Sequence, residues 1–373
     1  MTFTSIDQSL LGPYSSSAST FLGVGRNRFI NGEMSIDQQN GGNVVTVNNS
    51  GIRFWSVDGN WFGSGQPASG VFTLQRLSAT PPTGFTNYLR IQTTTADATI
   101  ASQFYILRTL WEGLQTRDFL WGTANAKTIT VSFWVRGSIT GTYSFALTNA
   151  TATRFYVATY VINSANTWEK KIVTIPGDTV GTWVTDTTQN LVFTIPVGVA
   201  AFRQTGTTNQ WVTSGTELDQ ATGAVNIIQT LNATLDFTGM QMEIGSAATP
   251  YEYKPFALEL QLCQRLFEKS YDIDTAVGTA TGTNGDEVAG GQTGATTVTT
   301  SAIYYKVTKR VNPIVTTWDY SGTSGNGAWR STSGVDTNRA TTVVNGCTRY
   351  FGLRQTVALD YLVQCQWAAD ARL

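Results

Sequence analysis

Hydrophobic and polar residues alternate along most of this chain, and that period of two predicts β-strands. In TITVSFWVR the residues Ile129, Val131, Phe133 and Val135 share one face, as expected for a half-buried strand. The run ATLDFTGMQMEI alternates with one slip near Gly239, which predicts a β-bulge. Before residue 255 strands are expected at 44–47, 71–77, 88–94, 104–111, 128–136, 142–147, 154–161, 168–175, 191–195 and 233–244. Strands of this number, separated by turn residues, predict a jelly-roll β-sandwich.

A second group of strands is expected near the C-terminus. Alternation predicts strands at 301–309 and 314–318, and Asn345-Gly346 between 340–344 and 347–353 predicts a hairpin. In the last segment one face carries Val357, Leu359, Tyr361, Val363, Cys365 and Trp367. Residues 272–373 are therefore expected to form a smaller antiparallel β domain.

One stretch, Pro255 to Tyr271, follows helical spacing instead. Phe256, Leu260, Cys263 and Phe267 recur at steps of four, three and four, which places them on one stripe of a helix. Two interpretations remain open. The stripe packs on a sheet of its own chain, or it forms a seam between three copies of the helix in a homotrimer.

These patterns divide the chain into four parts. Residues 1–28 lack a periodic pattern and are expected to be an extended anchoring arm. Residues 29–254 are expected to form the jelly roll, residues 255–271 the connecting helix and residues 272–373 the C-terminal domain.

Composition excludes several classes of function. Charged residues make up 13% of the chain and the net charge is −1, so nothing indicates a surface for nucleic acid or anionic membrane. The chain has no His, which excludes Ser–His–Asp and Cys–His catalysis and His metal sites. The three Cys are widely spaced and predict free thiols, as in a protein folded in a reducing cytoplasm. No apolar run predicts membrane insertion, and no signal peptide is evident.

Aromatic residues give the candidate binding site. Trp134 and Trp168 lie in expected strands and are interpreted as core or inter-sheet packing. The loop WDYSGTSGNGAWR combines aromatic faces with the polar groups that bind sugar hydroxyls. Its candidate glycan-binding residues are Trp318, Asp319, Tyr320, Asn326, Trp329 and Arg330. The alternative is a loop folded over its own aromatics or buried between subunits.

No catalytic or metal-binding set stands out. Sugar hydrolysis needs two carboxyl groups at a defined separation, and no spacing singles out a pair among Asp97, Asp118, Asp178, Asp186, Asp219 and Asp236. We therefore expect no enzyme and no cofactor. A structural calcium ion held by loop oxygens stays open as an alternative.

Six segments together resemble bacteriophage tail-fibre and related virion proteins, which carry a jelly roll similar to carbohydrate-binding modules. They are NRFINGEMSIDQQNGG, FTLQRL, FTNYLRIQTTTADATIA, TITVSFWVRGSITGTYSFAL, NTWEKKIVTIPGD and TGMQMEIGSAATPYEYKPFALELQLCQRLFEKS, within residues 27–271. The resemblance implies a homotrimer on the virion, assembled in the host cytoplasm and contacting the host surface. The short arm and the lack of a long shaft leave a compact spike, a fibre tip or a capsid-attached protein open.

The expected function is therefore that of a non-enzymatic virion protein that binds host surface glycan and attaches to other virion proteins through its arm. One rival is a purely structural decoration protein that binds no glycan. The other is a polysaccharide depolymerase, although the β-helix repeats common in such enzymes are not evident.

Overall fold

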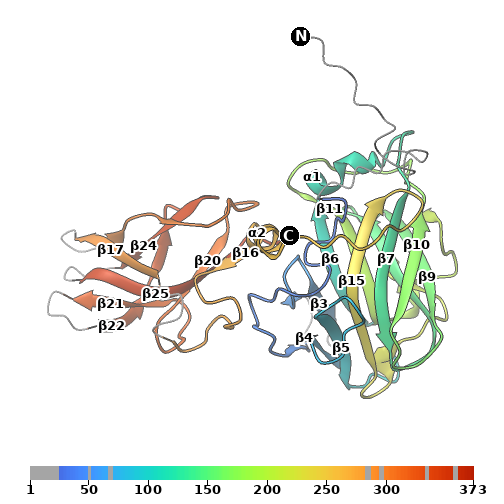
Figure 1. The fold of residues 1–373 in the computed structure, drawn as a ribbon, viewed down its shortest axis with the longest axis horizontal. Helices are drawn as coiled ribbons and strands as arrows, with labels where there is room; N and C mark the ends of the chain where they lie inside the picture. Colours follow the sequence, from blue (N-terminus) through green and yellow to red (C-terminus); the bar gives the residue numbers. More distant parts are fainter. Residues whose placement is uncertain are drawn as a thin grey trace, which may run out of the picture.

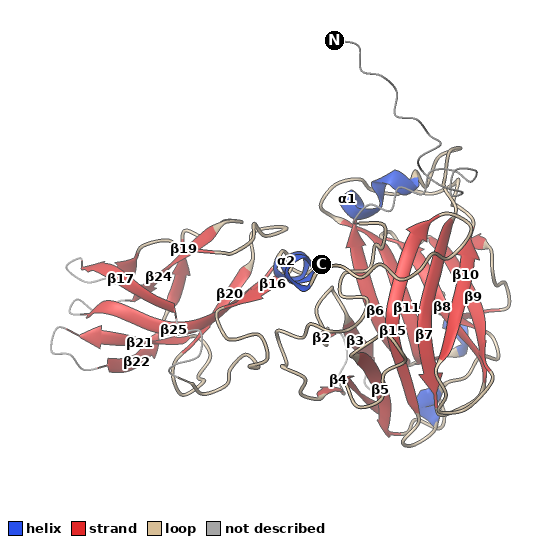
Figure 2. Ribbon diagram, viewed as in Figure 1, coloured by secondary structure: helices blue, strands red, loops and turns tan. Residues whose placement is uncertain are grey.

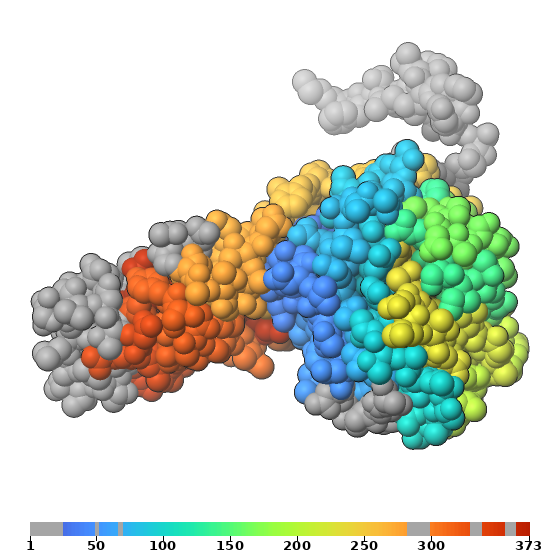
Figure 3. Space-filling view, turned by 90° about the horizontal axis from the view of Figure 1, so that it is seen from below, coloured from blue at the N-terminus to red at the C-terminus, as the bar shows by residue number. Residues whose placement is uncertain are grey.

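The computed structural model describes residues 25–48, 52–65, 70–281, 287–293, 298–331, 336–355 and 360–373, which form two β lobes joined at a short helix (Figure 1). The view coloured by secondary structure shows that strands dominate both lobes (Figure 2). In the space-filling view, orange residues that follow the helix lie against the blue start of the larger lobe (Figure 3).

The larger lobe is a sandwich of two antiparallel sheets. One sheet has the order β1 (Val45–Val47), β4 (Val71–Leu77), β5 (Tyr88–Thr95), β15 (Thr234–Ile244), β7 (Ile129–Gly137) and β10 (Glu169–Ile175). The other has the order β13 (Trp211–Thr213), β9 (Arg154–Ile162), β8 (Gly141–Asn149), β11 (Gln189–Val199), β6 (Phe104–Glu112), β3 (Phe62–Gly65) and β2 (Phe54–Trp55). The chain crosses repeatedly between the sheets, as in a jelly roll, so the predicted fold class is confirmed.

Short elements complete this lobe. Helix α1 (Gly113–Thr116) and the 3₁₀ turns η2 (Arg117–Phe119), η3 (Ala201–Arg203) and η4 (Ile227–Gln229) lie in its connections. Strands β12 (Gln204–Thr205) and β14 (Gln220–Ala221) form a small parallel pair. The sequence pattern did not predict β2, β3 or these short strands, because two to four residues are too few to show alternation.

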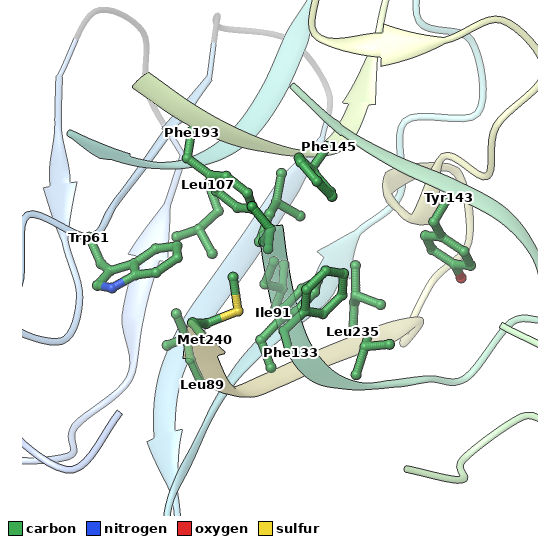
Figure 4. Close-up of a cluster of buried hydrophobic side chains, with 14 of the residues drawn as sticks. Trp61, Leu89, Ile91, Leu107, Phe133, Tyr143, Phe145, Phe193, Leu235 and Met240 are labelled. Carbon is green, nitrogen blue, oxygen red and sulfur yellow. The ribbon is translucent and has the colours of Figure 1, made fainter. Parts of the chain in front are cut away.

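The core of the sandwich lies between the two sheets. Phe133 and Leu235 from one sheet face Leu107, Phe145 and Phe193 from the other (Figure 4). The rings of Phe145 and Phe193 stack with centroids 4.9 Å apart. The alternation that places Ile129, Val131, Phe133 and Val135 on the core face is confirmed, since all four are buried.

The C-terminal lobe is built around the long strand β25 (Asp360–Asp370). Its sheet has the order β19 (Ile303–Tyr304), β24 (Tyr350–Gln355), β18 (Val298–Thr300), β17 (Glu287–Thr293), β25, β21 (Asn326–Ser331) and β22 (Asp336–Ala340). Three strands pair off this path: β16 (Phe267–Lys269) and β20 (Ile314–Trp318) with β25, and β23 (Thr342–Val344) with β24. Every pairing is antiparallel, and the predicted hairpin at Asn345-Gly346 is present as β23 and β24. Val363, Cys365 and Trp367 share the buried face of β25 as predicted.

The helix is shorter than its sequence pattern predicts. Helix α2 spans Phe256–Gln264, and the chain then turns so that Phe267–Lys269 becomes β16, paired with Ala368–Asp370 of β25. Tertiary pairing therefore outweighs the helical period of residues 265–271. The backbone gains ladder hydrogen bonds to β25, and the charged group of Glu268 is buried against Lys309.

Two other sequence expectations need correction. Most of the expected strand 301–309 is irregular, because only Ile303–Tyr304 pair with β24. Residues 1–24 of the expected arm lie outside the described residues, but residues 25–28 are docked on the sandwich. The amides of Gly25 and Asn27 donate to the carboxylate of Glu252, and Arg26 pairs with Glu243.

The three cysteines are free thiols, as expected, with Cys263 and Cys365 buried. Among the described residues no helix is long and apolar enough to span a membrane.

Candidate functional site

The predicted glycan loop after β20 uses its polar groups internally. Asp319 is 1% exposed, and its Oδ1 accepts hydrogen bonds from the Ser321 amide (2.9 Å) and hydroxyl (2.6 Å) and from the Thr323 amide (3.0 Å). Its Oδ2 accepts one from Asn326 Nδ2 at 3.2 Å. Burial raises the pKa of Asp319, but these hydrogen bonds outweigh it and leave the pKa below its usual range. Asp319 and Asn326 therefore hold the turn in shape and have little capacity left for a ligand.

The remaining members of the predicted glycan site do not join them. Trp318 is the last residue of β20, and its indole packs edge-on against Tyr271 with centroids 6.1 Å apart. Tyr320 is half-buried in the turn. Trp329 and Arg330 belong to the backbone of β21, and their side chains lie outside the described part of the structure. Trp318 does line a pocket, but on the side of β20 that faces the larger lobe.

The expected trimer seam is also divided. Phe256 is 56% exposed on α2, whereas Cys263 is completely buried in a cluster with Ile30, Ile36 and Leu266. Leu260 is partly buried against the same cluster, and Phe267 is buried in β16. The four side chains therefore do not form one helical stripe, because the helix ends before Phe267.

The scattered carboxylates have structural partners within the sandwich. Asp178 forms a bidentate pair with Arg154, Asp236 is held between Arg90 and Arg136, and Asp219 pairs with Arg108 and Arg203. Asp97 accepts from Tyr105, Asp118 pairs with Arg28, and Asp186 accepts from Thr188. Within the described ranges no three Cys, Asp or Glu residues lie together in a way that could hold a metal ion.

A pocket of about 280 Å³ opens on the outer face of the sheet that contains β15, β7 and β10. We call it the sheet-face pocket, and it is lined by Thr83, Phe85, Ser132, Trp134, Lys170, Gly239, Pro250, Tyr251 and Tyr253. In register, Trp134 lies between Thr238 of β15 and Lys170 of β10, so strand pairing fixes its position on this face. The chain after β15 supplies Pro250, Tyr251 and Tyr253 as it runs to α2 (Figure 1).

The floor of the sheet-face pocket depends on the bulge at Gly239. The β15–β7 register shifts between Thr238 and Gln241, and Gly239 has φ +62°, a left-handed conformation that favours glycine. A Cβ at this position would lie 2.6 Å from Phe85 Cζ and 3.1 Å from Trp134 Cδ1. The missing side chain therefore allows Phe85 and Trp134 to approach each other over the bulge.

The wall of the pocket is an aromatic cluster. The ring of Tyr251 lies edge-on to Phe85 (5.1 Å) and to Tyr253 (4.9 Å). Tyr253 is 56% exposed and its hydroxyl donates to Gly84 O at 2.9 Å, which fixes the loop before β5. Burial raises the pKa of Tyr251 well above its usual value, and the carboxylates of Glu33 and Glu259 add to the effect, so its phenol stays protonated.

Polar groups border this aromatic wall. The exposed side chain of Lys170 lies beside Trp134 and makes no salt bridge within the described residues. Thr83 and Ser132 add hydroxyl groups. An indole surface beside hydroxyl groups and one cation suits a small, flat ligand that has both C–H faces and hydroxyl groups. The volume of the sheet-face pocket is at the low end of the range for ligand pockets.

Sequence reasoning missed this pocket because it assigned Trp134 to the core. That assignment is wrong, since Trp134 lies on the outer face of β7 and is only partly buried. The signal was present in the strand pattern. Phe133 and Val135 face the core, so Trp134 between them must point to the other face. Trp168 is likewise outside the core, where Arg136 stacks on its ring at 4.6 Å.

Comparison with known proteins adds a set of weakly similar structures. No protein-family model matches the chain, and no curated protein is significantly similar to it. The family 11 carbohydrate-binding module from Clostridium thermocellum, in complex with a mixed-linked β-1,3-1,4 tetrasaccharide, shares 10% identity and has a TM-score of 0.28, with 55% of this chain and 98% of the module covered. The tandem CBM22-1–CBM22-2 domain of Paenibacillus barcinonensis Xyn10C shares 10% identity and has a TM-score of 0.25. This match covers 87% of this chain and 99% of the tandem domain.

A phage protein is also among these structures. The enzymatically active domain of tailspike protein 4 of bacteriophage CBA120 shares 9% identity and has a TM-score of 0.28. The match covers 50% of this chain and 19% of the tailspike chain. The similar structures thus include carbohydrate-binding modules and a phage tailspike domain.

Proposed function

We propose that this chain is a non-enzymatic, sugar-binding protein, and that its sheet-face pocket holds one sugar unit of a surface glycan. Trp134 provides the face on which the C–H groups of the sugar ring pack, while Lys170, Thr83 and Ser132 are placed to bond hydroxyls. The observation that carries the proposal is the partly exposed Trp134 in an aromatic pocket bordered by a cation without a carboxylate partner in the described chain.

Binding to a glycan array followed by calorimetry with the best ligand tests this proposal. Trp134→Ala is expected to weaken binding at least tenfold, which corresponds to about 1.4 kcal/mol, and to leave folding intact because the ring lies outside the core. Tyr304→Ala is the matched control, since Tyr304 is an aromatic residue 70% exposed on β19 in the other lobe. Equal affinity of the Trp134 variant and the control would refute the pocket.

We also propose the wider role that the sequence resemblance implies, a homotrimeric virion appendage that attaches through its N-terminal arm. Among the seam residues, Phe256 is the one with an exposed aromatic side chain, so Phe256→Asp is the informative change. It is expected to dissociate the trimer while the melting temperature of the monomer stays unchanged, as measured by light scattering. A wild-type chain that is monomeric at micromolar concentration would refute the trimer.

A further inference from the structure

A second pocket, of about 250 Å³, lies where the two lobes meet. Strand register builds its floor. Ile314 of β20 and Phe267 of β16 both pair with Asp370 of β25, and Thr316 pairs with Ala368, so these residues lie on one face of a three-stranded surface. Trp318, two residues beyond Thr316, stands at one end of the floor. We call this site the junction pocket.

Gln39 of the larger lobe also lines the junction pocket, together with Val277, which follows α2 and β16. The amide of Val277 donates to the backbone oxygen of Gln39 at 3.0 Å, which holds both residues over the floor. The side-chain Oε1 of Gln39 is buried and has no hydrogen-bond partner within the described residues. A buried acceptor without a partner costs free energy, so a ligand that donates a hydrogen bond to Gln39 would be stabilised.

Charge in the junction pocket is balanced. Arg372 donates to Asp370 through Nε (2.9 Å) and Nη2 (2.6 Å). Its guanidinium also stacks on Phe267 at 4.4 Å and on Trp55 at 4.0 Å, which fixes the pair at the end of the pocket opposite Trp318. A charged ligand would have to compete with this ion pair, whereas a neutral ligand with hydroxyl groups would not.

We propose that the junction pocket binds a second, neutral sugar unit, with Trp318 against the ring and a ligand hydroxyl donating to Gln39 Oε1. This inference rests on the proposed function for the class of ligand, and it goes beyond that function in placing a binding site between the lobes. Because Gln39 belongs to one lobe and Trp318 to the other, an occupied pocket links the two lobes through the ligand. Trp318 was expected to bind glycan together with Asp319 and Asn326; the proposal gives it different partners.

Fluorine NMR of the full chain labelled with 5-fluorotryptophan tests the two pockets separately. Trp134→Phe and Trp318→Phe assign the two resonances, and the probes are glucose, galactose and N-acetylglucosamine. We expect at least one sugar to shift the Trp318 resonance in a saturable way. Gln39→Leu, which keeps the size of the side chain but removes the acceptor, is expected to abolish that shift and to leave the Trp134 resonance as in the wild type.

Each outcome decides the question. A Trp318 shift that is lost in the Gln39 variant supports the junction pocket, and it does so whether or not Trp134 responds. If Trp134 shifts and Trp318 does not, the proposed function stands and the junction pocket is refuted. If neither resonance responds to any of the three sugars, both proposals fail. A Trp318 shift that persists unchanged in the Gln39 variant overturns the role assigned to Gln39.

Discussion

Gly239→Ala is the sharpest test of how the sheet-face pocket is built. The residue has φ +62°, where an L-residue with a Cβ costs about 1–2 kcal/mol more than glycine. The new methyl group would also lie 2.6 Å from Phe85 Cζ and 3.0 Å from Phe85 Cε1, so the ring and its loop must move. Overpacking of this kind costs about 1–3 kcal/mol. The free energy of unfolding is therefore expected to fall by about 2–5 kcal/mol.

Gly223→Ala is the matched control for backbone strain. Gly223 has φ +80°, and no heavy atom lies within 4 Å of the position that its Cβ would take. The free energy of unfolding of the Gly223→Ala variant should therefore fall only by the cost of the left-handed backbone conformation, about 1–2 kcal/mol. Urea unfolding followed by far-ultraviolet circular dichroism measures both variants. Losses that agree within about 0.5 kcal/mol would refute the close approach of Phe85 to the bulge, and with it the account of how Trp134 and Phe85 come together.

Three further predictions concern the lobe junction and the arm. Burial raises the pKa of the Asp58 carboxyl from 3.8 to about 7, so the stability that this group contributes is present below about pH 4 and is lost as the pH rises through 7. In the wild type the free energy of unfolding should therefore decline between about pH 5 and pH 8. Asp58→Asn should make that decline smaller by about 2–3 kcal/mol, as measured by urea unfolding at the two pH values. Lys309→Met leaves the fully buried carboxylate of Glu268 without its cation and should lower the free energy of unfolding by about 3–5 kcal/mol. The double variant with Glu268→Gln should recover much of this loss, because it also removes the unpaired charge. Deleting residues 1–24 should leave the melting temperature unchanged and abolish incorporation into particles. Deleting residues 1–28 should lower the melting temperature, because Asn27 is buried and donates a hydrogen bond to Met240 O. Equal melting temperatures of the two deletion variants would contradict this expectation.

Local alternation predicted much of the fold, because strand faces follow directly from it. Strand β4 matches its expected range, and the bulge in β15 occurs at the predicted glycine. Strand β11 is longer than expected, 189–199 rather than 191–195, because pairing with β6 extends it past Pro196 and Gly198. Such extension depends on partner strands distant in sequence, which alternation within one segment cannot reveal.

The candidate sites were harder to predict because they depend on which residues cover a face. Alternation places Trp134 on the outer face of β7, but nothing local shows that residues 250–253 and the loop before β5 wall it into a pocket. The loop after β20 has the composition of a sugar site, yet its Asp319 is used by its own turn. Composition identifies groups that are able to bind a ligand, but only the tertiary structure shows which of them still have unused hydrogen-bonding capacity.

The position of α2 restricts how this chain can associate. The amide of Asn31 donates to Glu259, and the same carboxylate pairs with Lys254 at 3.3 Å, so one side of the helix is bonded to the segment that opens the larger lobe. Cys263 is enclosed on that side by Ile30 and Ile36. A symmetric seam through Cys263 would require the helix to move away from this segment. That movement would break the contacts of Glu259 with Asn31 and Lys254 and would uncover the apolar cluster of Cys263, Ile30 and Ile36. Any trimer that uses α2 must therefore do so through its outer side, where Phe256 is exposed, with the lobes on either side providing the rest of the interface.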